Sequence, residues 1–307
     1  MNVVPIVFAF DDKMLMPAAV CIDSLLKNAL PDTFYDIFII HHQKYDFSSS
    51  CLKELSKQHS SFKITYKKIG DTFGDAYEVR GVTKTTYYRL IIPDIVTEYE
   101  KVLYSDVDVI FRDDLTKYYN IELGENYFAA VDSSMALNPD DKEYVRKNLG
   151  LNLSDGFYYA GNLVVNSALL RKDRMVKQFI QMAQKDYKFQ DMDIINLSCN
   201  GRILPLSPAY CLTDYIYDKM IKEPALFKQE EIKEALEKGV VHYNGPKPWV
   251  EGCLNMDIWW HYYRNSIFFD EAFAHKIWSN QRYVLERLSL SKRIKLVARY
   301  FRKGGRM

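Results

Sequence analysis

The sequence predicts an α/β protein with a mostly parallel central sheet, flanking helices and a helical C-terminal extension. Residues 3–10 form a near-continuous apolar run, which is typical of a strand buried on both faces of a parallel sheet. Strand and helix patterns then alternate, as in consecutive βαβ units with right-handed crossovers. A chain of 307 residues, 48% of them hydrophobic, is long enough to bury one large core.

The N-terminal elements follow from apolar spacing and from helix-stop signals. Residues 17–28 place apolar side chains at helical spacing and end shortly before Pro31. Residues 48–58 begin with serines, which cap helix N-termini, and therefore predict a second helix. Strands are expected at 36–40 and at 62–69, and apolar and polar residues alternate in the latter.

The elements that follow are marked by a proline and by further apolar runs. We expect residues 83–92 to form a helix that Pro93 halts, because proline lacks the amide hydrogen that a helix interior needs. An apolar strand at 101–105 leads into an Asp-Val-Asp sequence. The other expected elements are strands at 127–131 and 161–165 and helices at 172–185 and 191–199.

The composition argues against several classes of protein. A net charge of +1 provides no overall field for binding nucleic acid. The five cysteines stand apart without a CxxC pair, which indicates reduced thiols and not a disulfide framework. The N-terminus lacks the features of a signal peptide, and no apolar run reaches the length of a membrane-spanning helix. We therefore expect a cytoplasmic protein.

The strongest local signal is the pair Asp106 and Asp108, directly after an apolar strand. In an extended segment both carboxylates point to the same side. They would then lie at the strand end where open α/β sheets bind ligands. Two close carboxylates favour a divalent cation, which can bridge diphosphate oxygens. The same spacing recurs at Asp191 and Asp193, so the pattern alone does not identify a site.

A second signal lies at 240–249, where His242 follows a short apolar run and a Gly-Pro turn presents Lys247. A neutral imidazole beside carboxylates suits Mn²⁺ as well as Mg²⁺. A lysine ammonium can meet phosphate as a point charge. Taken alone, the segment fits an ordinary histidine in a surface turn better than a ligand site.

Six blocks of sequence follow one another between residues 3 and 249. They are VFAFDD at 7–12, TTYYRL at 85–90, KVLYSDVD at 101–108, YAGNLVVN at 159–166, QDMDIIN at 190–196 and HYNGPKPW at 242–249. In this order they resemble glycosyltransferase family 8, a retaining group with the GT-A fold. The family includes bacterial lipooligosaccharide galactosyltransferases and glycogenin. Each block is moderately specific, and the ordered set is very specific.

The resemblance implies a transferase that moves galactose or glucose from a UDP-sugar to a hydroxyl of a glycan or glycolipid acceptor. The implied pathway is the synthesis of bacterial surface polysaccharide, lipopolysaccharide or glycoprotein glycans. Mn²⁺, with Mg²⁺ as the alternative, would be held by Asp106, Asp108 and His242 against the donor diphosphate. The residues implied to bind the UDP portion are Ala9, Asp11, Arg89, Asp106, Val107, Asp108, Gly245 and Lys247. Those implied to face the sugar are Asp132, Tyr159, Ala160, Gly161, Asp191 and Met192.

Three departures from the family pattern bear on substrate recognition. Lys13 and Met14 stand where bacterial relatives usually carry Asn-Tyr, whose tyrosine stacks on uracil. Tyr159 replaces an asparagine that usually contacts the donor sugar, so the resemblance does not carry over the identity of that sugar. Lys247 follows His242 one residue sooner than usual.

The resemblance assigns catalysis to Asp191, Arg89 and Lys247. Met192 aligns with a position proposed as a nucleophile in relatives, but a thioether is not a credible nucleophile at a sugar carbon. The nucleophile is then Asp191 or Asp193, or there is none. We favour the last alternative, a transfer on one face in which the metal, Arg89 and Lys247 draw charge onto UDP.

Residues 1–265 are expected to form the GT-A domain, with residues 1–108 as its nucleotide-binding half and residues 266–307 as the helical extension. The segment 291–307 is rich in lysine and arginine, has no acidic residue, and repeats apolar residues at three- and four-residue steps. This pattern predicts a basic amphipathic helix on an anionic membrane surface. The protein would then lie peripherally on the inner face of the cell membrane. A helix docked on its own domain is the alternative.

Two other functions stay open. A strand followed by Asp106 also fits the entry motif of haloacid-dehalogenase-type phosphatases, although that motif normally lies near the start of its domain. The departures at Lys13, Met14, Tyr159 and Met192 also fit a degenerate transferase that binds sugar or a partner enzyme. The intact metal triad argues against this second alternative.

Overall fold

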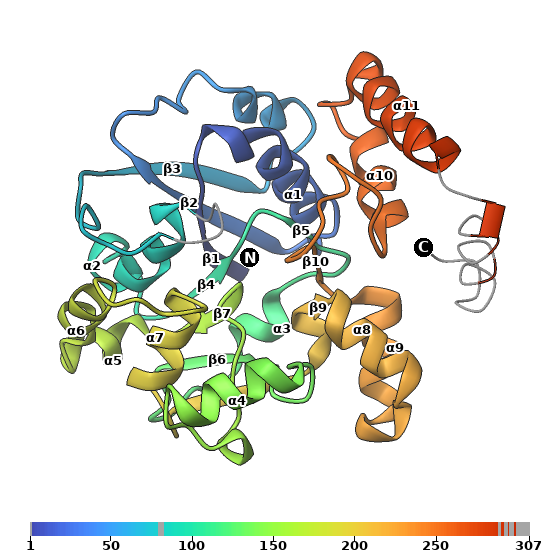
Figure 1. The fold of residues 1–307 in the computed structure, drawn as a ribbon. Coiled ribbons are helices and arrows are strands. Elements are labelled where there is room, and N and C mark those ends of the chain that lie inside the picture. The colour runs from blue at the N-terminus through green and yellow to red at the C-terminus, as the bar shows by residue number, and fades with distance from the viewer. Residues whose placement is uncertain (1, 79–82, 288–289, 292–293, 295–297, 299–307) are drawn as a thin grey trace.

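The computed structural model describes residues 2–78, 83–287, 290–291, 294 and 298. In this part of the chain a seven-stranded sheet has the order β3-β2-β1-β4-β7-β6-β8, and a three-stranded sheet has the order β5-β10-β9 (Figure 1). The strands are β1 (Asn2–Ala9), β2 (Thr33–His42), β3 (Phe62–Ile69), β4 (Val102–Ser105), β5 (Val109–Ile110), β6 (Phe128–Val131), β7 (Asn162–Val165), β8 (Ile203–Leu206), β9 (Leu212–Thr213) and β10 (Val241–His242).

The large sheet is mostly parallel, as the sequence predicts. Strands β3, β2, β1 and β4 run parallel, whereas β7 is antiparallel to both β4 and β6. Strand β8 is parallel to β6. Strand β2 is longer than expected because it pairs along its length with both neighbours, from Thr33 opposite Asn2 to His42 opposite Ile69.

Helices pack on both faces of the large sheet. The α-helices are α1 (Leu15–Lys27), α2 (Ile92–Ile95), α3 (Thr116–Tyr119), α4 (Pro139–Lys147), α5 (Ser167–Lys172), α6 (Met175–Met182), α7 (Asp191–Ser198), α8 (Asp214–Lys222), α9 (Gln229–Lys238), α10 (Met256–Arg264) and α11 (Glu271–Arg287). The 3₁₀ segments are η1 (Asp12–Met14), η2 (Cys51–Lys57), η3 (Lys84–Ile91), η4 (Leu153–Asp155), η5 (Pro208–Tyr210) and η6 (Pro224–Leu226).

Three helix predictions need correction. The serine-led helix at 48–58 is the 3₁₀ segment η2, and Ser50 makes no side-chain cap bond. Pro93 does not end a helix but lies in the first turn of α2, where the missing amide hydrogen costs nothing. The preceding η3 is 3₁₀, consistent with the low helix propensity of its Thr and Tyr residues. The helix at 172–185 is α6 alone, because the left-handed backbone of Arg174 (φ 56°) separates it from α5.

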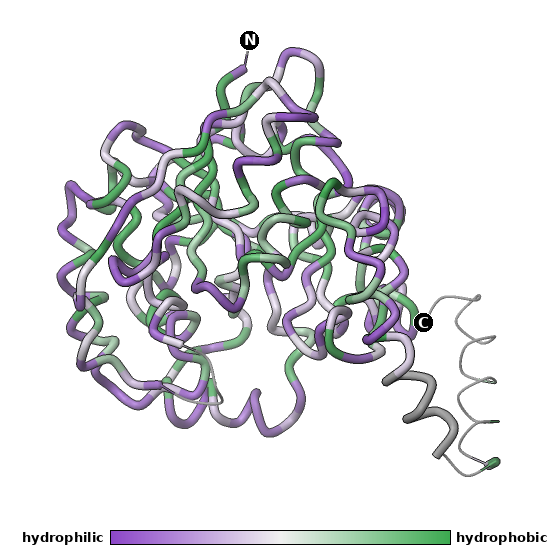
Figure 2. Tube along the Cα trace, turned by 90° about the horizontal axis from the view of Figure 1, so that it is seen from above, coloured by the Kyte–Doolittle hydropathy of each residue, from purple (hydrophilic) through white to green (hydrophobic). Residues whose placement is uncertain are grey.

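Two apolar clusters cover the two faces of the large sheet. Alternating side chains of β1 join different clusters, with Phe8 in the one that includes α1 and α10 and Val7 in the one that includes η3 and α7. Figure 1 shows α2, α5, α6 and α7 gathered on one side of the molecule and α8, α9, α10 and α11 on the other. Figure 2 shows hydrophobic segments running through the body and hydrophilic ones around its periphery.

No helix in the described ranges is both long and apolar enough to span a membrane. Apart from residues 291, 294 and 298, the predicted basic amphipathic tail lies outside the described residues.

Candidate active site

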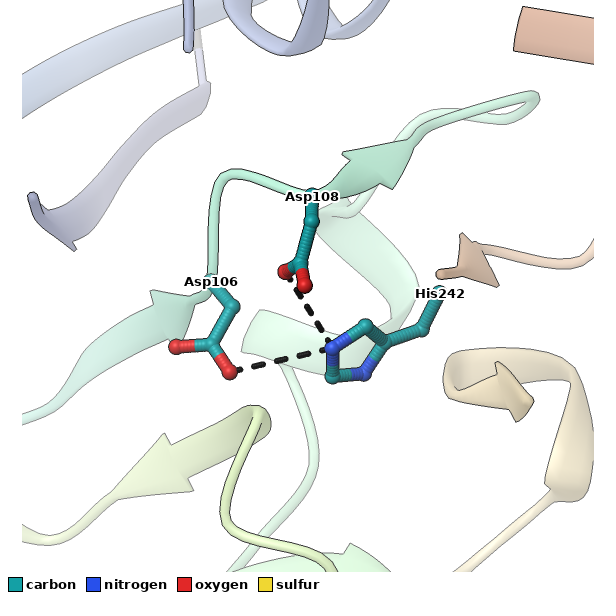
Figure 3. Close-up of side chains that lie close together, drawn as sticks. All are labelled: Asp106, Asp108 and His242. Carbon is teal, nitrogen blue, oxygen red and sulfur yellow. Dashed lines mark ion pairs between the residues drawn. The ribbon is translucent and has the colours of Figure 1, made fainter. Parts of the chain in front are cut away.

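Asp106 and Asp108 lie in the bend that joins β4 to β5, and His242 lies on β10, which pairs with β5. Val107 is buried between the two aspartates, so both carboxylates turn the other way, toward the imidazole. The Nε2 atom of His242 is 3.3 Å from Oδ1 of Asp108 and 3.7 Å from Oδ2 of Asp106 (Figure 3). One ligand atom from each residue lies within 4.8 Å of the others.

Each aspartate of this triad is also paired with a cation of the chain. Arg89 binds Asp106, with its two terminal nitrogens 2.8 and 3.4 Å from the carboxylate oxygens. Tyr104 donates a further hydrogen bond of 2.7 Å to Asp106. Nζ of Lys247 is 2.6 Å from Oδ2 of Asp108. Two carboxylates can lie this close because Arg89 and Lys247 compensate their charge.

The proximity of these charges shifts the pKa values of Asp108 and His242. Burial alone raises the pKa of Asp108, but Lys247 and His242 outweigh it and hold that pKa far below its ordinary value. Burial lowers the pKa of His242, but Asp108 outweighs it and raises that pKa to about 10. A cation bound at Nε2 would therefore replace a proton there.

A second carboxylate, Asp191, completes a buried network with Arg89. Nε of Arg89 is 3.1 Å from Oδ2 of Asp191, and the Thr86 hydroxyl donates a 2.6 Å hydrogen bond to Oδ1. Burial raises the pKa of Asp191, and Arg89 partly offsets this effect. Asp191 and Arg89 are each 6% exposed, so both charged groups of this network are buried.

The triad lies in a cleft of about 640 Å³ at the carboxyl ends of β1 and β4. Most of the residues that the sequence analysis assigned to substrate line this cleft. They are Ala9, Asp11, Arg89, Asp106, Val107, Asp108, Tyr159, Ala160, Gly161, Asp191, Met192, His242 and Lys247. Met14 also lines it.

Asp132 and Gly245 are not among the lining residues. Asp132 Oδ1 accepts hydrogen bonds from the amides of Ser134 and Phe157, and its Oδ2 accepts one from the Ser134 hydroxyl. Both oxygens thus hold a local turn. Gly245 is flanked by Asn244, which does line the cleft.

Several residues that the sequence analysis did not single out support the site. Tyr104 donates a hydrogen bond to Asp106, and Thr86 donates one to Asp191. The buried thiol of Cys211 contacts the second ring nitrogen of His242, with Sγ 3.4 Å from Nδ1. Thr86 could have been found, because it lies three residues before Arg89 on one short helical segment. Nothing in the local sequence marks Cys211.

The triad fits a divalent metal. Two carboxylate oxygens and one imidazole nitrogen suit Mn²⁺ and also Mg²⁺. Gly161 provides the room, since a Cβ there would lie 2.2 Å from Cε1 of His242 and 2.9 Å from Oδ2 of Asp106. The backbone is therefore bare where any side chain would press on two of the three triad residues.

The fold and this site together define a glycosyltransferase of the GT-A class. Solved structures with this fold include the galactosyltransferase LgtC in complex with donor and acceptor sugar analogs, with a TM-score of 0.72 and 22% identity. That match covers 89% of this chain and 100% of LgtC. The bifunctional glycosyltransferase WbbM matches with a TM-score of 0.71 and 22% identity, over 92% of this chain and 52% of WbbM.

The chain belongs to glycosyltransferase family 8, whose family model matches residues 5–253. It is 23% identical over 286 residues to lipopolysaccharide 1,3-galactosyltransferase of Salmonella typhimurium, covering 90% of this chain and 79% of that protein. It is 29% identical over 211 residues to glycosyltransferase GlyE of Streptococcus pneumoniae, covering 65% of this chain and 46% of GlyE. This membership contradicts the phosphatase alternative.

Proposed function

We propose that the protein is a retaining, metal-dependent hexosyltransferase that passes galactose or glucose from a UDP-sugar to a hydroxyl of a glycan or glycolipid acceptor. The observation that carries the proposal is the triad of Asp106, Asp108 and His242, flanked in one cleft by Arg89 and Lys247. Cations and carboxylates arranged in this way suit a metal-bridged diphosphate. The similarity to a lipopolysaccharide galactosyltransferase supports a role in bacterial surface glycan synthesis.

In this proposal Asp106, Asp108 and His242 hold Mn²⁺ or Mg²⁺, which when bound would neutralise charge on the diphosphate leaving group. Arg89 and Lys247 supply further positive charge on that group. Arg89 is already oriented by Asp106, Asp191 and the Ala160 carbonyl, so it needs little reorganisation. Lys247 instead exchanges Asp108 for a phosphate oxygen.

The remaining lining residues divide between the two parts of the donor. Ala9, Asp11 and Val107 face the uridine side, together with Gly245 next to the cleft. Those proposed for the sugar are Tyr159, Ala160, Gly161, Asp191 and Met192, with Asp132 acting through the turn it holds. The Tyr159 hydroxyl lies 3.2 Å from the Thr213 hydroxyl, so its ring is fixed as a wall of the sugar pocket.

The network around Asp191 supports transfer on one face of the sugar without a protein nucleophile. Each carboxylate oxygen of Asp191 already has a partner, Thr86 on one side and Arg89 on the other. Asp193 is fully buried and bonded to Tyr144. Met192 offers only a thioether. NMR of the product linkage tests this stereochemistry: a retained anomeric configuration is expected, and an inverted one would rule it out.

We also propose that residues 1–265 form the catalytic domain, with residues 1–108 as its nucleotide-binding half, and that the 266–307 extension contacts the inner face of the membrane. The support for membrane contact is the basic and apolar pattern of residues 291–307. A chain ending at Ser289 should leave the membrane fraction of lysed cells and keep its donor hydrolysis. Unchanged partitioning would contradict this role.

Calorimetric titration with UDP tests the proposed site. The wild type should bind UDP with Mn²⁺ and lose most of this affinity in EDTA. Asp108→Asn should bind UDP equally weakly under both conditions, because it keeps the shape of the side chain and removes the charged ligand. Asp113→Asn is the matched control, since Asp113 pairs with Lys117 away from the cleft. Metal-dependent binding in Asp108→Asn would contradict the assignment.

A further inference from the structure

The His242 ring has a second contact, at the nitrogen that does not face the triad carboxylates. Cys211 directly precedes β9, and β9 runs parallel to β10 with Leu212 opposite Val241 and Thr213 opposite His242. This pairing places the Cys211 sulfur 3.4 Å from Nδ1 of His242. Cys211 is 0% exposed and His242 4% exposed, so water does not compete freely for this contact.

The two ring nitrogens of His242 have different surroundings. Nε2 faces the carboxylates of Asp106 and Asp108, whereas Nδ1 faces the sulfur. A histidine binds a metal through the nitrogen that carries a lone pair, and the other nitrogen then carries the proton. If Nε2 is the ligand, Nδ1–H must be the donor and the sulfur the acceptor. The opposite arrangement, with the thiol donating to Nδ1, would put the ring proton on Nε2 and block the ligand position.

Gly161 lies against the Cε1–Nδ1 edge of the ring. A Cβ at Gly161 would lie 2.2 Å from Cε1 and 2.9 Å from Nδ1 of His242. The Gly161 backbone and the Cys211 sulfur thus both confine this edge of the imidazole. A ring flip would remove the Nδ1 hydrogen bond and turn a carbon toward one of the carboxylates.

We propose that Cys211 is a positioning residue for the metal site: its sulfur accepts a hydrogen bond from Nδ1–H of His242 and directs the Nε2 lone pair at the space between Asp106 and Asp108. Ligating histidines usually donate their second N–H to a carboxylate, a backbone carbonyl or water. A carboxylate here would add negative charge to a cluster that already contains Asp106, Asp108 and Asp191. The Cys211 sulfur is a weak acceptor that orients the ring without a further carboxylate in this cluster.

This inference rests on the proposed function, and Mn²⁺ binding tests it without any transfer reaction. The fraction of free Mn²⁺ is measured by electron paramagnetic resonance with UDP present, for the wild type, Cys211→Ala and Cys211→Ser. Cys211→Ala should weaken Mn²⁺ binding by about tenfold, the lower end of the effects seen when such supporting contacts are lost. Cys211→Ser keeps a hydrogen-bond acceptor and should recover most of the affinity.

Cys199→Ala is the matched control, because Cys199 is 1% exposed and lies in the apolar cluster that includes η3 and α7, not in the one that contains Cys211. It should lose stability like Cys211→Ala but keep the Mn²⁺ affinity of the wild type, and UDP binding in EDTA should be alike in all four proteins. Unchanged Mn²⁺ affinity in Cys211→Ala, or equal losses in the Ala and Ser variants, would overturn the positioning role alone. A wild type that binds no Mn²⁺ with UDP would overturn the proposed function as well.

Discussion

The ammonium group of Lys247 lies 2.6 Å from Oδ2 of Asp108, and it also donates to the Tyr243 carbonyl. Arg89 pairs in the same way with Asp106. The chain's own cations thus balance the carboxylates of the triad. A divalent cation at Asp108 competes with Lys247 for the charge of this carboxylate, whereas a diphosphate offers the ammonium a new partner. Metal and nucleotide should therefore bind cooperatively.

Replacing Lys247 by Met should separate the competition of Lys247 with the metal from its contact with the diphosphate. Without UDP, Mn²⁺ affinity should rise by about tenfold, ~1.4 kcal/mol, because a competing charge is gone. With Mn²⁺ present, UDP affinity should fall, because a phosphate partner is gone. Calorimetry of each ligand with and without the other measures both changes. Lys238→Met, on the exposed face of α9, is the control and should match the wild type. Weaker Mn²⁺ binding without UDP would contradict the exchange.

Gly161→Ala should damage the metal site while the protein stays folded. The added Cβ would lie 2.2 Å from Cε1 of His242, a distance that real contacts do not reach, so the ring must move. Mn²⁺-dependent UDP binding should drop at least about tenfold. Gly252→Ala is the control, since its Cβ would meet nothing nearer than Met256 Sδ at 3.9 Å. Normal metal binding in Gly161→Ala would contradict this prediction, because the His242 ring could then move without loss of the metal.

Arg89→Met should be destabilising as well as inactive. The substitution keeps an apolar chain of similar reach but leaves the buried Asp191 and the half-buried Asp106 without their shared cation. Breaking a buried ion pair in this way costs about 3–5 kcal/mol. Urea denaturation measures the loss. Full stability in Arg89→Met would mean that water or Lys247 compensates both carboxylates.

Asp193 should make stability depend on pH. It is fully buried, it accepts hydrogen bonds from the Tyr144 hydroxyl and the Phe189 amide, and burial raises its pKa from 3.8 to about 6. Because the folded-state pKa is the higher one, this carboxyl stabilises the fold most below pH 3.8, and the contribution is lost as the pH rises through 6.

The stability of the wild type relative to Asp193→Asn should therefore decline between about pH 4 and pH 6. Asparagine keeps an oxygen for Tyr144 and Phe189 but does not titrate. Urea denaturation of both proteins at a series of pH values measures the difference. A difference that stays constant with pH would contradict the raised pKa.

The local patterns of the sequence predict the strands that position Asp11, Asp106 and Asp108. The apolar runs before Asp11 and Asp106 correspond to β1 and β4, the two parallel strands whose carboxyl ends form the cleft. Both strands are buried on their two faces, so nearly every residue in them is apolar. Such apolar runs are easy to recognise in the sequence. His242 could be assigned only through the family resemblance, since it reaches the aspartates by the pairing of β10 with β5, which no local pattern encodes.

The contacts that orient the ligands were not predictable. Tyr104, Thr86 and Cys211 each act through a geometry that depends on tertiary packing. Their residue types are common in ordinary cores and turns, so composition gives no signal. Asp132 shows the converse, because its family position implied sugar contact, whereas its oxygens bind the backbone and hydroxyl of a nearby turn.

The most direct test of the central claim is UDP release from a panel of UDP-sugars, measured with Mn²⁺, with Mg²⁺ and with EDTA. We expect selective hydrolysis of UDP-galactose or UDP-glucose that requires the metal and disappears in Asp108→Asn. Release that is equally fast in EDTA, or that persists in Asp108→Asn, would contradict a metal-dependent transferase centred on Asp106, Asp108 and His242.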